Sequence, residues 1–437
     1  MRISVIGCGY LGAVHAACMA QLGHDVVGID VDESKIEVLA AARAPFFEPG
    51  LNEILDSATR TGRLRFSTSI SEVEGSQVHF IAVGTPQRKG ENAADLRYVD
   101  AAVDSLLPYL GPEDLVVGKS TVPVGTAARL AARIADHGSG ASLAWNPEFL
   151  REGFAVKDTI SPDRLVYGVA EGQEAKRATA LLDEVYAEAL SHDTPLIVTD
   201  YATAELVKVS ANAFLATKIS FINAMAEITE AAGGDVTALA DAIGHDSRIG
   251  RRFLNAGIGF GGGCLPKDIR AFTARAEELG RGESTAFLKE VDKINLRRRE
   301  HMVEMVVNAL GGTVYQKKVT VLGLAFKPES DDVRDSPALD VAVRLNGLGA
   351  HVVATDPAAI PNSIRLHPQL GFATDTRDAL RGADAVVLVT EWKDYRELDP
   401  IEIGSLVNDK MILDGRNVLD PRLWRDAGWT YRGMGRP

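Results

Sequence analysis

The chain has 437 residues, 46% hydrophobic and 24% charged, which excludes a disordered or collagen-like protein and allows two or three domains with large cores. Its 47 basic and 60 acidic residues give a net charge of −13, which argues against non-specific binding to nucleic acid or anionic membranes. Three scattered cysteines form no disulfide framework, and neither a targeting segment nor an apolar run of about 18 residues is visible. We therefore expect a soluble cytoplasmic protein.

Strand and helix patterns alternate through the first part of the chain. Short, apolar, β-branched segments predict strands, and small apolar residues after the first of them predict a closely packed helix. The strands are expected at 2–6, 24–29, 78–83, 115–119 and 142–145, and the helix at 13–22. Such an alternation predicts an α/β fold with a parallel, doubly wound sheet.

From about residue 199 the pattern becomes helical. The segments 201–232 and 284–310 contain no proline and predict long helices, and the apolar length of the first makes it the expected dimer surface. A second α/β unit begins near residue 317, with strands expected at 319–322, 351–355 and 385–389 and a helix at 339–348. We expect doubly wound domains at 1–198 and 311–437, with a helical domain at 199–310 between them.

A glycine-rich turn follows the first predicted strand. Gly7, Gly9 and Gly12 form a Gly-x-Gly-x-x-Gly pattern that opens a helix, and Asp30 ends the next strand. The three glycines suit a tight turn, a close pyrophosphate and close helix–strand packing. Asp30 would bind ribose hydroxyls and repel a 2′-phosphate, so NAD is predicted over NADP; the alternative is a purely structural turn. Lys35 is either a ribose or phosphate contact or a solvated lysine.

The second α/β unit has no such fingerprint. Its first strand is followed by residues 323–328, which offer a single glycine. The carboxyl ends of its strands still form a ligand crevice, where a nucleotide moiety can bind. We do not expect a second dinucleotide site of the usual kind.

The sharpest local feature is the segment 259–268, Gly-Phe-Gly-Gly-Gly-Cys-Leu-Pro-Lys-Asp. Its glycines allow the backbone to fold closely around a ligand. Pro266 marks the start of a helix, which places Cys264 at a helix N-terminus, where the dipole favours the thiolate. Cys264 is therefore predicted to be a nucleophile, whereas Cys8 and Cys18 are expected to be buried and inert.

Three weaker features carry polar groups at strand ends or on one helix face. Lys208 and Asn212 are four residues apart, so they share a face of the predicted long helix. Two loops each follow a strand. The loop 146–153 supplies two carboxylates, and the loop 120–125 supplies hydroxyl groups. Each feature alone is more often ordinary surface than a site.

Several motifs occur together in one order along the chain. They are Gly7–Gly12, Glu48-Pro-Gly-Leu51, Gly84-Thr-Pro86, Ser120-Thr-Val-Pro123, Asn146–Gly153, Lys208 with Asn212, Gly259–Asp268, Phe326-Lys-Pro328 and Asp332-Val-Arg-Asp-Ser-Pro337. This set resembles the UDP-glucose/GDP-mannose dehydrogenase family over essentially the whole chain. The resemblance implies two Rossmann-like domains joined by a long helix, with the nucleotide sugar bound by the C-terminal one. It also implies oxidation of a C6 alcohol to a carboxylate with two NAD per turnover.

The resemblance further implies a covalent mechanism. A cysteine thiolate attacks the aldehyde from the first oxidation, a lysine and an asparagine stabilise the oxyanion of the thiohemiacetal, and the second oxidation gives a thioester. A carboxylate then helps water to hydrolyse this thioester. The implied catalytic residues are Cys264, Lys208, Asn212, Asp268, Glu148, Thr121 and Glu152. Glu148 is the favoured base, but the division of roles between Glu148 and Glu152 stays open.

Ligand contacts are implied in the same way. Those for the cofactor are Gly7, Gly9, Tyr10, Leu11, Gly12, Asp30, Lys35, Thr85, Pro86, Thr121, Glu152 and Arg334. Those for the nucleotide sugar are Phe149, Leu150, Arg151, Glu152, Lys208, Asn212, Arg248, Phe253, Asn255, Gly259, Phe260, Gly261, Lys327 and Arg416. Arg248 would reach a neighbouring subunit's site, so at least a homodimer is expected. No metal, nucleic-acid or membrane partner is expected.

Other functions stay open at this point. The same chemistry on GDP-mannose or a UDP-N-acetylhexosamine would use the same catalytic set. A single-step β-hydroxyacid dehydrogenase needs neither Cys264 nor residues 317–437, and an NAD-sensing binding protein has no use for a helix-capping thiol. The predicted substrate is UDP-glucose and the predicted product UDP-glucuronate. Gly263 stands where the family frequently has serine, and we expect it to loosen the cysteine loop.

Overall fold

The computed structural model describes residues 1–437, and its internal contacts divide the chain into two compact units. The first unit comprises residues 1–211 and 274–280, and the second comprises residues 212–273 and 281–437. The chain passes between the units three times, within α9 (Tyr201–Ala232), within α11 (Leu265–Glu278) and between Gly280 and Arg281. The three domains expected above follow element type rather than contacts, so those boundaries stay a prediction.

The first unit is built on an eight-stranded sheet with the order β3-β2-β1-β4-β5-β6-β7-β8. Its elements are β1 (Arg2–Ile6), α1 (Tyr10–Gln21), β2 (Asp25–Ile29), α2 (Glu33–Ala40), α3 (Leu51–Arg60), β3 (Leu64–Ser67), β4 (Val78–Ile81), α4 (Arg97–Leu106), β5 (Leu115–Gly118), α5 (Thr126–His137), β6 (Ser142–Trp145), α6 (Ala155–Ile160), β7 (Leu165–Val169), α7 (Gln173–Val185), α8 (Ala187–Ser191) and β8 (Leu196–Thr199). The five strands expected in this region are all present, and β3, β7 and β8 are additional.

One strand pair departs from the expected parallel sheet. Strands β6 and β7 are antiparallel, with Ala144 opposite Val169, while the other neighbours are parallel. The connection between them, residues 146–164, contains only the short helix α6, whereas a parallel connection needs a crossover that spans the sheet. This connection begins with the expected catalytic loop, at the carboxyl end of β6.

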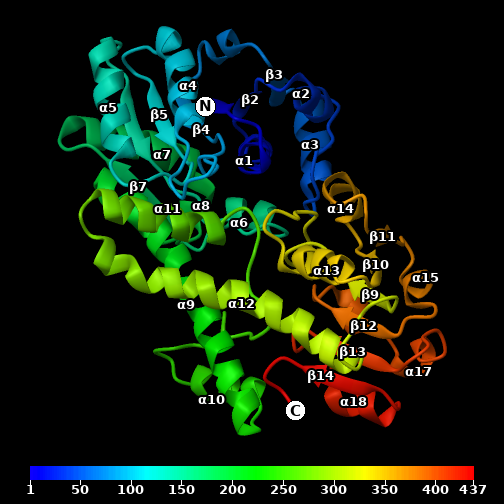
Figure 1. Cartoon of the computed structure of the whole chain (residues 1–437). Coiled ribbons are helices and arrows are strands. Elements are labelled where there is room, and N and C mark those ends of the chain that lie inside the picture. Colours follow the sequence, from blue (N-terminus) through cyan, green and yellow to red (C-terminus); the bar gives the residue numbers. More distant parts are fainter. The chain divides into compact units, whose positions relative to one another are not determined.

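Helices cover both faces of this sheet (Figure 1). Successive strand residues alternate between two buried clusters, as Val26 and Val27 do. The first cluster takes in apolar residues of α1, α3 and α7, and the second those of α4 and α5. The sheet is therefore doubly wound, as the sequence predicts.

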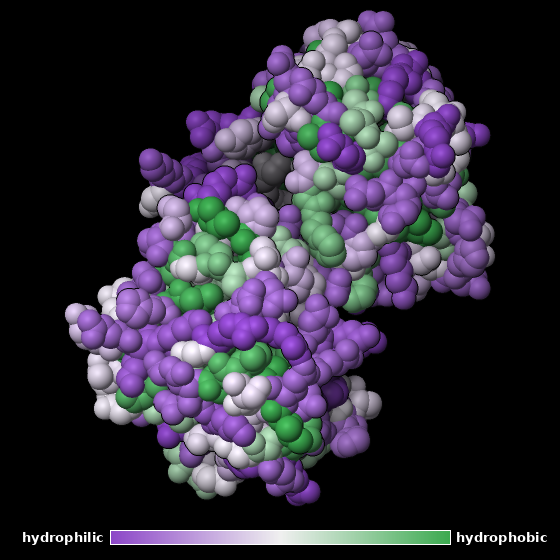
Figure 2. Space-filling model, turned by 90° about the vertical axis from the view of Figure 1, so that its right-hand side faces the viewer, coloured by the Kyte–Doolittle hydropathy of each residue, from purple (hydrophilic) through white to green (hydrophobic).

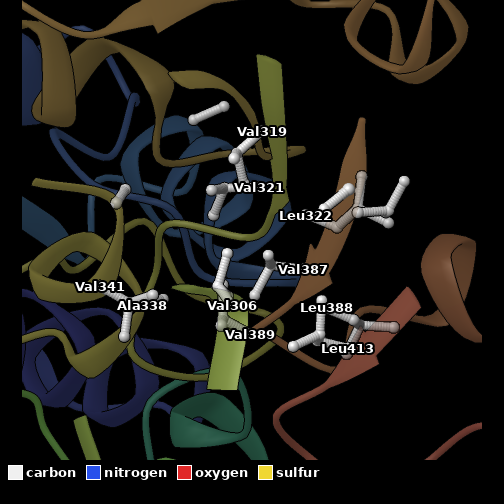
Figure 3. Close-up of a cluster of buried hydrophobic side chains, with 14 of the residues drawn as sticks. Val306, Val319, Val321, Leu322, Ala338, Val341, Val387, Leu388, Val389 and Leu413 are labelled. Atoms are coloured by element: carbon white, nitrogen blue, oxygen red, sulfur yellow. The ribbon is translucent and has the colours of Figure 1, made fainter. Parts of the chain in front are cut away.

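The second unit contains a parallel six-stranded sheet with the order β11-β10-β9-β12-β13-β14. After the unit's part of α9 come α10 (Val236–Gly244), its part of α11, α12 (Ala286–Ala309), β9 (Lys318–Leu322), α13 (Pro337–Gly347), β10 (His351–Thr355), α14 (Ile360–Leu366), β11 (Gly371–Phe372), α15 (Thr376–Leu380), β12 (Ala385–Leu388), α16 (Lys393–Arg396), α17 (Pro400–Ile403), β13 (Met411–Asp414), α18 (Pro421–Asp426) and β14 (Thr430–Gly433). The sheet core in Figure 3 joins side chains of β9, β12 and β13 to Val306 of α12 and Val341 of α13.

Hydrophilic side chains predominate on the face shown in Figure 2, where hydrophobic ones form small patches. None of the helices combines the length and the apolar character needed to cross a bilayer. The structure also contains no group of three or more His, Cys, Asp or Glu side chains suited to hold a metal ion.

Candidate active site

The glycine-rich turn of the first unit connects β1 to α1. Gly7 has φ +92°, a conformation that glycine adopts without strain. A Cβ on Gly12 would lie 1.8 Å from the Gly7 carbonyl oxygen, so this glycine is required by the protein itself. A Cβ on Gly9 would meet nothing within 4 Å, which leaves open space in front of the N-terminus of α1. Unpaired N–H groups at a helix start bind phosphate oxygens, so this turn suits a dinucleotide.

Asp30 lies at the end of β2, beside this turn. Its carboxylate accepts hydrogen bonds from the Cys8 N–H at 2.8 Å and the Asp32 N–H at 3.0 Å. Lys35 forms an ion pair with the same carboxylate at 2.8 Å. In this structure Lys35 thus pairs with Asp30, and its ammonium group has further N–H donors for a ribose or a phosphate.

The loops after β4 and β5 are joined by hydrogen bonds. The Thr85 hydroxyl donates to the Thr121 carbonyl at 2.8 Å, and the Ser120 hydroxyl donates to the Val83 carbonyl at 2.7 Å. Buried Glu205, on α9, accepts the N–H groups of Gly125 and Ala127, both at 2.7 Å. Since Glu205 lies three residues before Lys208, the segment that carries Thr121 is tied to the helix that carries the expected lysine.

Glu148 is held firmly in the loop after β6. One carboxylate oxygen accepts the N–H groups of Phe149 and Leu150 at 2.8 and 3.0 Å, and the other pairs with Lys119 at 3.0 Å. Burial is the largest single influence and raises the pKa of the Glu148 carboxyl, but Lys119, the Phe149 N–H and Lys208 together leave that pKa below its usual value. The Phe149 ring lies 5.5 Å from the Lys208 ammonium, so this loop and that lysine face each other within the first unit.

A second buried glutamate holds the far end of the same loop. Glu48 accepts the N–H groups of Gly153 and Ala155, both at 2.7 Å, and the Tyr10 hydroxyl. Burial and Glu48 raise the pKa of Tyr10, with a smaller effect from Glu152. Glu48 therefore joins the glycine-rich turn to the loop that carries both candidate glutamates. At the loop's middle, Arg151 is exposed and pairs with Asp158 at 2.7 Å.

In the second unit, Cys264 is exposed and directly precedes α11. Its carbonyl accepts the Asp268 N–H at 2.9 Å, so the cysteine occupies the start of the helix. The buried Asp268 carboxylate accepts the Asn212 amide at 2.7 Å and pairs with Lys267 at 2.6 Å. The thiol thus lies at the positive end of a helix beside an oriented Asn–Asp pair, an arrangement that favours a reactive thiolate.

The glycines before Cys264 have a packing role within the protein. A Cβ would lie 2.3 Å from the Asn295 side chain at Gly259, 2.3 Å from the Asp335 carbonyl at Gly261, and 2.8 Å from the Phe326 ring at Gly262. These glycines allow the loop to pack closely against the protein, and a close approach of the same loop to a ligand stays a prediction. At Gly263 a Cβ would meet the Arg334 guanidinium at 2.5 Å, so glycine gives that arginine room.

The remaining sugar-contact candidates are also in the second unit. Arg416 donates to the carbonyls of Val389, Gly259 and Phe326 at 2.8, 2.9 and 3.2 Å, which ties the cysteine loop to the loop after β9. The other candidates differ in exposure: Phe260 is buried, Lys327 is partly buried, and Arg248, Phe253, Asn255 and Arg334 are exposed. Arg248 pairs with Asp246 at 2.6 Å, and Phe253 has φ +67°.

The other two cysteines are buried, as expected. Burial raises the pKa of the Cys8 thiol, and raises that of Cys18 to about 12. Neither thiol is a thiolate near neutral pH, so neither is a nucleophile.

Sequence reasoning did not single out the groups that hold these loops in place. They are Lys119, Glu205 and, except as parts of motifs, Glu48 and Lys267. The one available signal was a charged residue at the end of a buried strand, which applies to Lys119 after β5.

Comparison with known proteins agrees with this geometry. Residues 1–190, 202–297 and 320–421 match the NAD binding, central and UDP binding domains of the UDP-glucose/GDP-mannose dehydrogenase family. The chain is 42% identical to UDP-glucose 6-dehydrogenase TuaD of Bacillus subtilis, covering 100% of this chain and 93% of that one. It is 41% identical to UDP-glucose 6-dehydrogenase of Rhizobium meliloti, covering 100% of both.

A solved structure supports the same relation. The UDP-glucose dehydrogenase of Pyrobaculum islandicum superimposes with a TM-score of 0.90 and 40% identity, covering 100% of this chain and 98% of that chain. The protein described here is therefore a member of the UDP-glucose/GDP-mannose dehydrogenase family, with that family's NAD-binding domain at its N-terminus.

Proposed function

We propose that this protein oxidises the C6 alcohol of UDP-glucose to the carboxylate of UDP-glucuronate in two steps, with two NAD per turnover. The observation that carries the proposal is Cys264, an exposed thiol at the start of α11 in a chain that also has a dinucleotide turn. One oxidation of an alcohol to an aldehyde has no use for a thiol, whereas a second oxidation does, because thiolate addition makes the aldehyde carbon tetrahedral and the oxyanion of the adduct can then expel the hydride that this carbon carries. Full-length relatives named for UDP-glucose support this substrate.

The residues of the first unit would hold the cofactor. The N–H groups at the start of α1 would bind its pyrophosphate and Asp30 its ribose, while Thr85, Pro86 and Thr121 are on the loops at the neighbouring strand ends. When bound, NAD accepts the hydride in each oxidation. Asp30 disfavours a 2′-phosphate at the ribose, which selects NAD.

Residues of the second unit, of α9 and of the loop after β6 would perform the covalent steps. The Cys264 thiolate attacks the aldehyde carbon, and the carbonyl oxygen becomes an oxyanion that takes hydrogen bonds from Lys208 and Asn212. Asp268 accepts one amide N–H of Asn212 at 2.7 Å, which leaves the other N–H for that oxyanion. Loss of hydride from the adduct gives a thioester. Water then attacks its carbonyl carbon and Glu148 takes one of the water's protons. The carbon–sulfur bond breaks so that Cys264 leaves as the thiolate, and the carboxylic acid formed loses its proton to solvent to give the carboxylate.

A substrate panel tests this function. We would incubate the protein with NAD and UDP-glucose, UDP-N-acetylglucosamine, UDP-N-acetylmannosamine or GDP-mannose, and count NADH per sugar consumed. Two NADH per UDP-glucose, with slower reaction of the others, is the expected result. Preference for another sugar would move the substrate assignment, and one NADH per sugar would refute the two-step chemistry.

Replacing Cys264 by serine tests the nucleophile. The less acidic hydroxyl of C264S forms the adduct poorly, and an ester there hydrolyses more slowly than a thioester, so the variant should stall before the carboxylate. The matched control is Cys18→Ala, whose cysteine is buried and should leave the stoichiometry unchanged. Steady turnover by C264S with two NADH per sugar would show that Cys264 is not the nucleophile.

We also propose that the active unit is at least a homodimer, in the cytoplasm, where a reducing environment suits a thiol nucleophile. Three exposed apolar residues of α9, Phe214, Phe221 and Ile228, recur every seven positions and form one stripe of this helix. Such a stripe suits contact with the same helix of a second copy. Arg248, whose side chain is 87% exposed, is available to a neighbouring subunit.

A mixing experiment tests the sharing of Arg248. Chains with Arg248→Ala and with Cys264→Ala, each inactive alone, are combined in equal amounts and reassembled. Half of the dimers are then mixed, and one of their two sites combines an intact Cys264 with the partner's arginine, which restores about one quarter of wild-type activity. No recovery in verified mixed dimers would show that each subunit uses its own arginine.

A further inference from the structure

Lys119 is a buried charged residue that the mechanism above does not use. It directly follows β5 and is 3% exposed. Its ammonium group has three partners: Glu148 at 3.0 Å, the Asn146 side-chain oxygen at 3.0 Å and the Tyr186 hydroxyl at 3.1 Å. An ammonium group has three N–H donors, so Lys119 is fully satisfied.

The rest of the network fixes these partners in turn. The Tyr186 hydroxyl donates to the Asn146 oxygen at 2.6 Å, and the Asn146 amide donates to the Val166 carbonyl at 3.0 Å. Val166 belongs to β7, so the network spans the ends of β5, β6 and β7. Its most exposed charged group is Glu148, whose side chain is 16% exposed against 4% for Lys119. The network therefore presents one carboxylate to the outside and keeps the counter-charge behind it.

This ion pair is not explained by stability. The desolvation of two buried charges generally offsets their attraction, and replacement by apolar side chains of similar volume is often neutral or stabilising. A carboxyl in such a place without a counter-charge behaves differently, because full burial can raise the pKa of a glutamate to about 8–9, which leaves it protonated at neutral pH. A protonated Glu148 cannot take a proton from water.

The charges around Glu148 act in both directions. Lys119 and the Lys208 ammonium lower its pKa, and burial raises it. The titratable groups that face Glu148 or Lys119, or that line the adjoining pocket, are Tyr186, Cys18, His15, Asp158, Asp163 and Arg164. Lys119 is the largest of the influences that lower the pKa of Glu148.

We propose that Lys119 is a positioning residue that keeps Glu148 ionised and fixed in orientation, so that Glu148 serves as an anion in the second half of the reaction. The inference rests on the proposed function and adds to it. Lys119 acts through Glu148, whose second oxygen is held by the Phe149 and Leu150 N–H groups. The substrate is not required to touch Lys119.

The test is the pH dependence of kcat in Lys119→Met, which removes the charge and keeps the side-chain length. Loss of the counter-charge raises the pKa of Glu148. When the pH is lowered, Glu148 is therefore protonated at a higher pH than in the wild type, and the activity that needs its anion is lost at that higher pH. We expect the acid limb of the profile to move up by about one unit or more, with little change in KM. Thioester should also accumulate, seen as NADH released ahead of carboxylate in quenched single turnovers.

Two further variants separate positioning from packing. Tyr186→Phe removes a hydroxyl from the same network but keeps the ion pair, so it should lower thermal stability and leave the acid limb in place. Lys119→Gln keeps a hydrogen-bond donor without the charge and should shift the limb in the same direction as Lys119→Met. Lys119→Arg, which restores a charge, should return the limb toward the wild-type position.

The outcomes are distinct. If the wild type does not give two NADH per sugar, the proposed function fails. If it does, and either neutral variant folds and keeps the wild-type acid limb, the role of Lys119 is refuted. Should both neutral variants fail to fold, the pH profile of the wild type decides. The acid limb that disappears in Glu148→Gln is the limb that reports the ionisation of Glu148. If this limb lies above about pH 7 in the wild type, Lys119 does not hold the Glu148 carboxyl ionised and the proposal is refuted.

Discussion

The two sheets begin in the same way and then diverge. In each, a glycine with positive φ follows the first strand, Gly7 at +92° and Gly323 at +109°, and its N–H donates to the end of the second strand. In each, an aspartate directly follows that second strand, Asp30 after β2 and Asp356 after β10. The shared geometry reflects how a parallel sheet starts rather than what it binds.

The aspartates differ in what they hold. Asp30 accepts two N–H groups and one ammonium group. Asp356 is 4% exposed and accepts five donors: the N–H groups of Leu324, Ala325, Ala358 and Ala359, and the Trp392 indole. A carboxylate has about four lone-pair sites, so Asp356 has none left for a ribose. The same residue at the same place is the proposed ligand group in one sheet and a structural group in the other.

The helices differ as well. Helix α1 begins at Tyr10, three residues after Gly7, whereas α13 begins at Pro337, fourteen residues after Gly323. The first sheet thus points a helix N-terminus at its turn, and the second fills that place with a loop that carries Lys327 and Arg334. A common fold therefore does not predict a common ligand; the residues around the turn decide it.

The largest expected effect comes from adding a methyl group at the first turn. Gly12→Ala places a Cβ 1.8 Å from the Gly7 carbonyl oxygen, which should destabilise the first unit by about 3 kcal/mol or more. Gly9→Ala is the matched control, because its Cβ meets nothing within 4 Å. It should keep stability within about 0.5 kcal/mol but raise the Kd for NAD at least about tenfold. Denaturant unfolding and calorimetric NAD titration measure both; equal stability of the two variants would contradict the packing argument.

The next effect separates the two aspartates. Asp356→Asn replaces a carboxylate oxygen by an amide, and in either orientation at least two of its five donors lose their acceptor. We expect a loss of about 2–4 kcal/mol in the stability of the second unit. The Kd for NAD should stay within about twofold. Loss of NAD binding in a folded D356N variant would show that the second sheet holds the dinucleotide after all.

A smaller effect is expected at the first aspartate. Asp30→Ser removes the charge that repels a 2′-phosphate, so the ratio of kcat/KM for NAD to that for NADP should fall by about tenfold or more, about 1.4 kcal/mol. The control is Asp32→Ser, two residues on, where the aspartate caps α2 and the serine can replace it. The two variants are compared by initial rates with both cofactors. Comparable use of NADP by the wild type would overturn the role of Asp30.

Local patterns in the sequence predict much of the fold. Apolar β-branched runs predict β1 and β6 with the observed bounds, and the proline-free run predicts α9 with its observed bounds. Strand β3 is missed because Leu64–Ser67 is only partly apolar, whereas β7 and β8 are apolar, β-branched runs that the same pattern could have marked. The antiparallel β6–β7 pair depends on the short connection, which periodicity does not reveal.

In the site, too, local motifs are predicted from the sequence and contacts between distant residues are not. The glycine turn and Cys264 stand in contiguous motifs whose chemistry is local. The groups that hold the loops are joined across the chain, as Glu48 is to Gly153 over 105 residues and Glu205 to Gly125 over 80 residues. Such pairs leave no local pattern in one sequence, because each carboxylate gains its partners only when the sheet forms.

The smallest predicted effect concerns acid stability, which should also differ between the units. His15, on α1, is fully buried against Phe80, with a ring distance of 4.4 Å. Burial and Lys119 lower its pKa well below the usual value. The four histidines of the second unit are at least partly exposed, so buried histidine titration weakens the first unit alone.

The sign follows from linkage. A histidine kept neutral in the folded state binds fewer protons than in the unfolded chain, so stability is full above the unfolded pKa of about 6.5 and falls as the pH drops below it. For His15 this loss is about 1.4 kcal/mol between pH 7.5 and 5.5. His15→Met has a side chain of similar volume without a titrating group. Between these two pH values, the variant should lose about 1.4 kcal/mol less stability than the wild type. The measurement is denaturant unfolding at both pH values with hydrogen exchange of α1 and β4 amides, and His137→Met, at an exposed position, is the control. Equal acid sensitivity of His15→Met and wild type would mean that His15 does not titrate on unfolding, and that the acid response of the first unit comes from His24 or from its carboxylates.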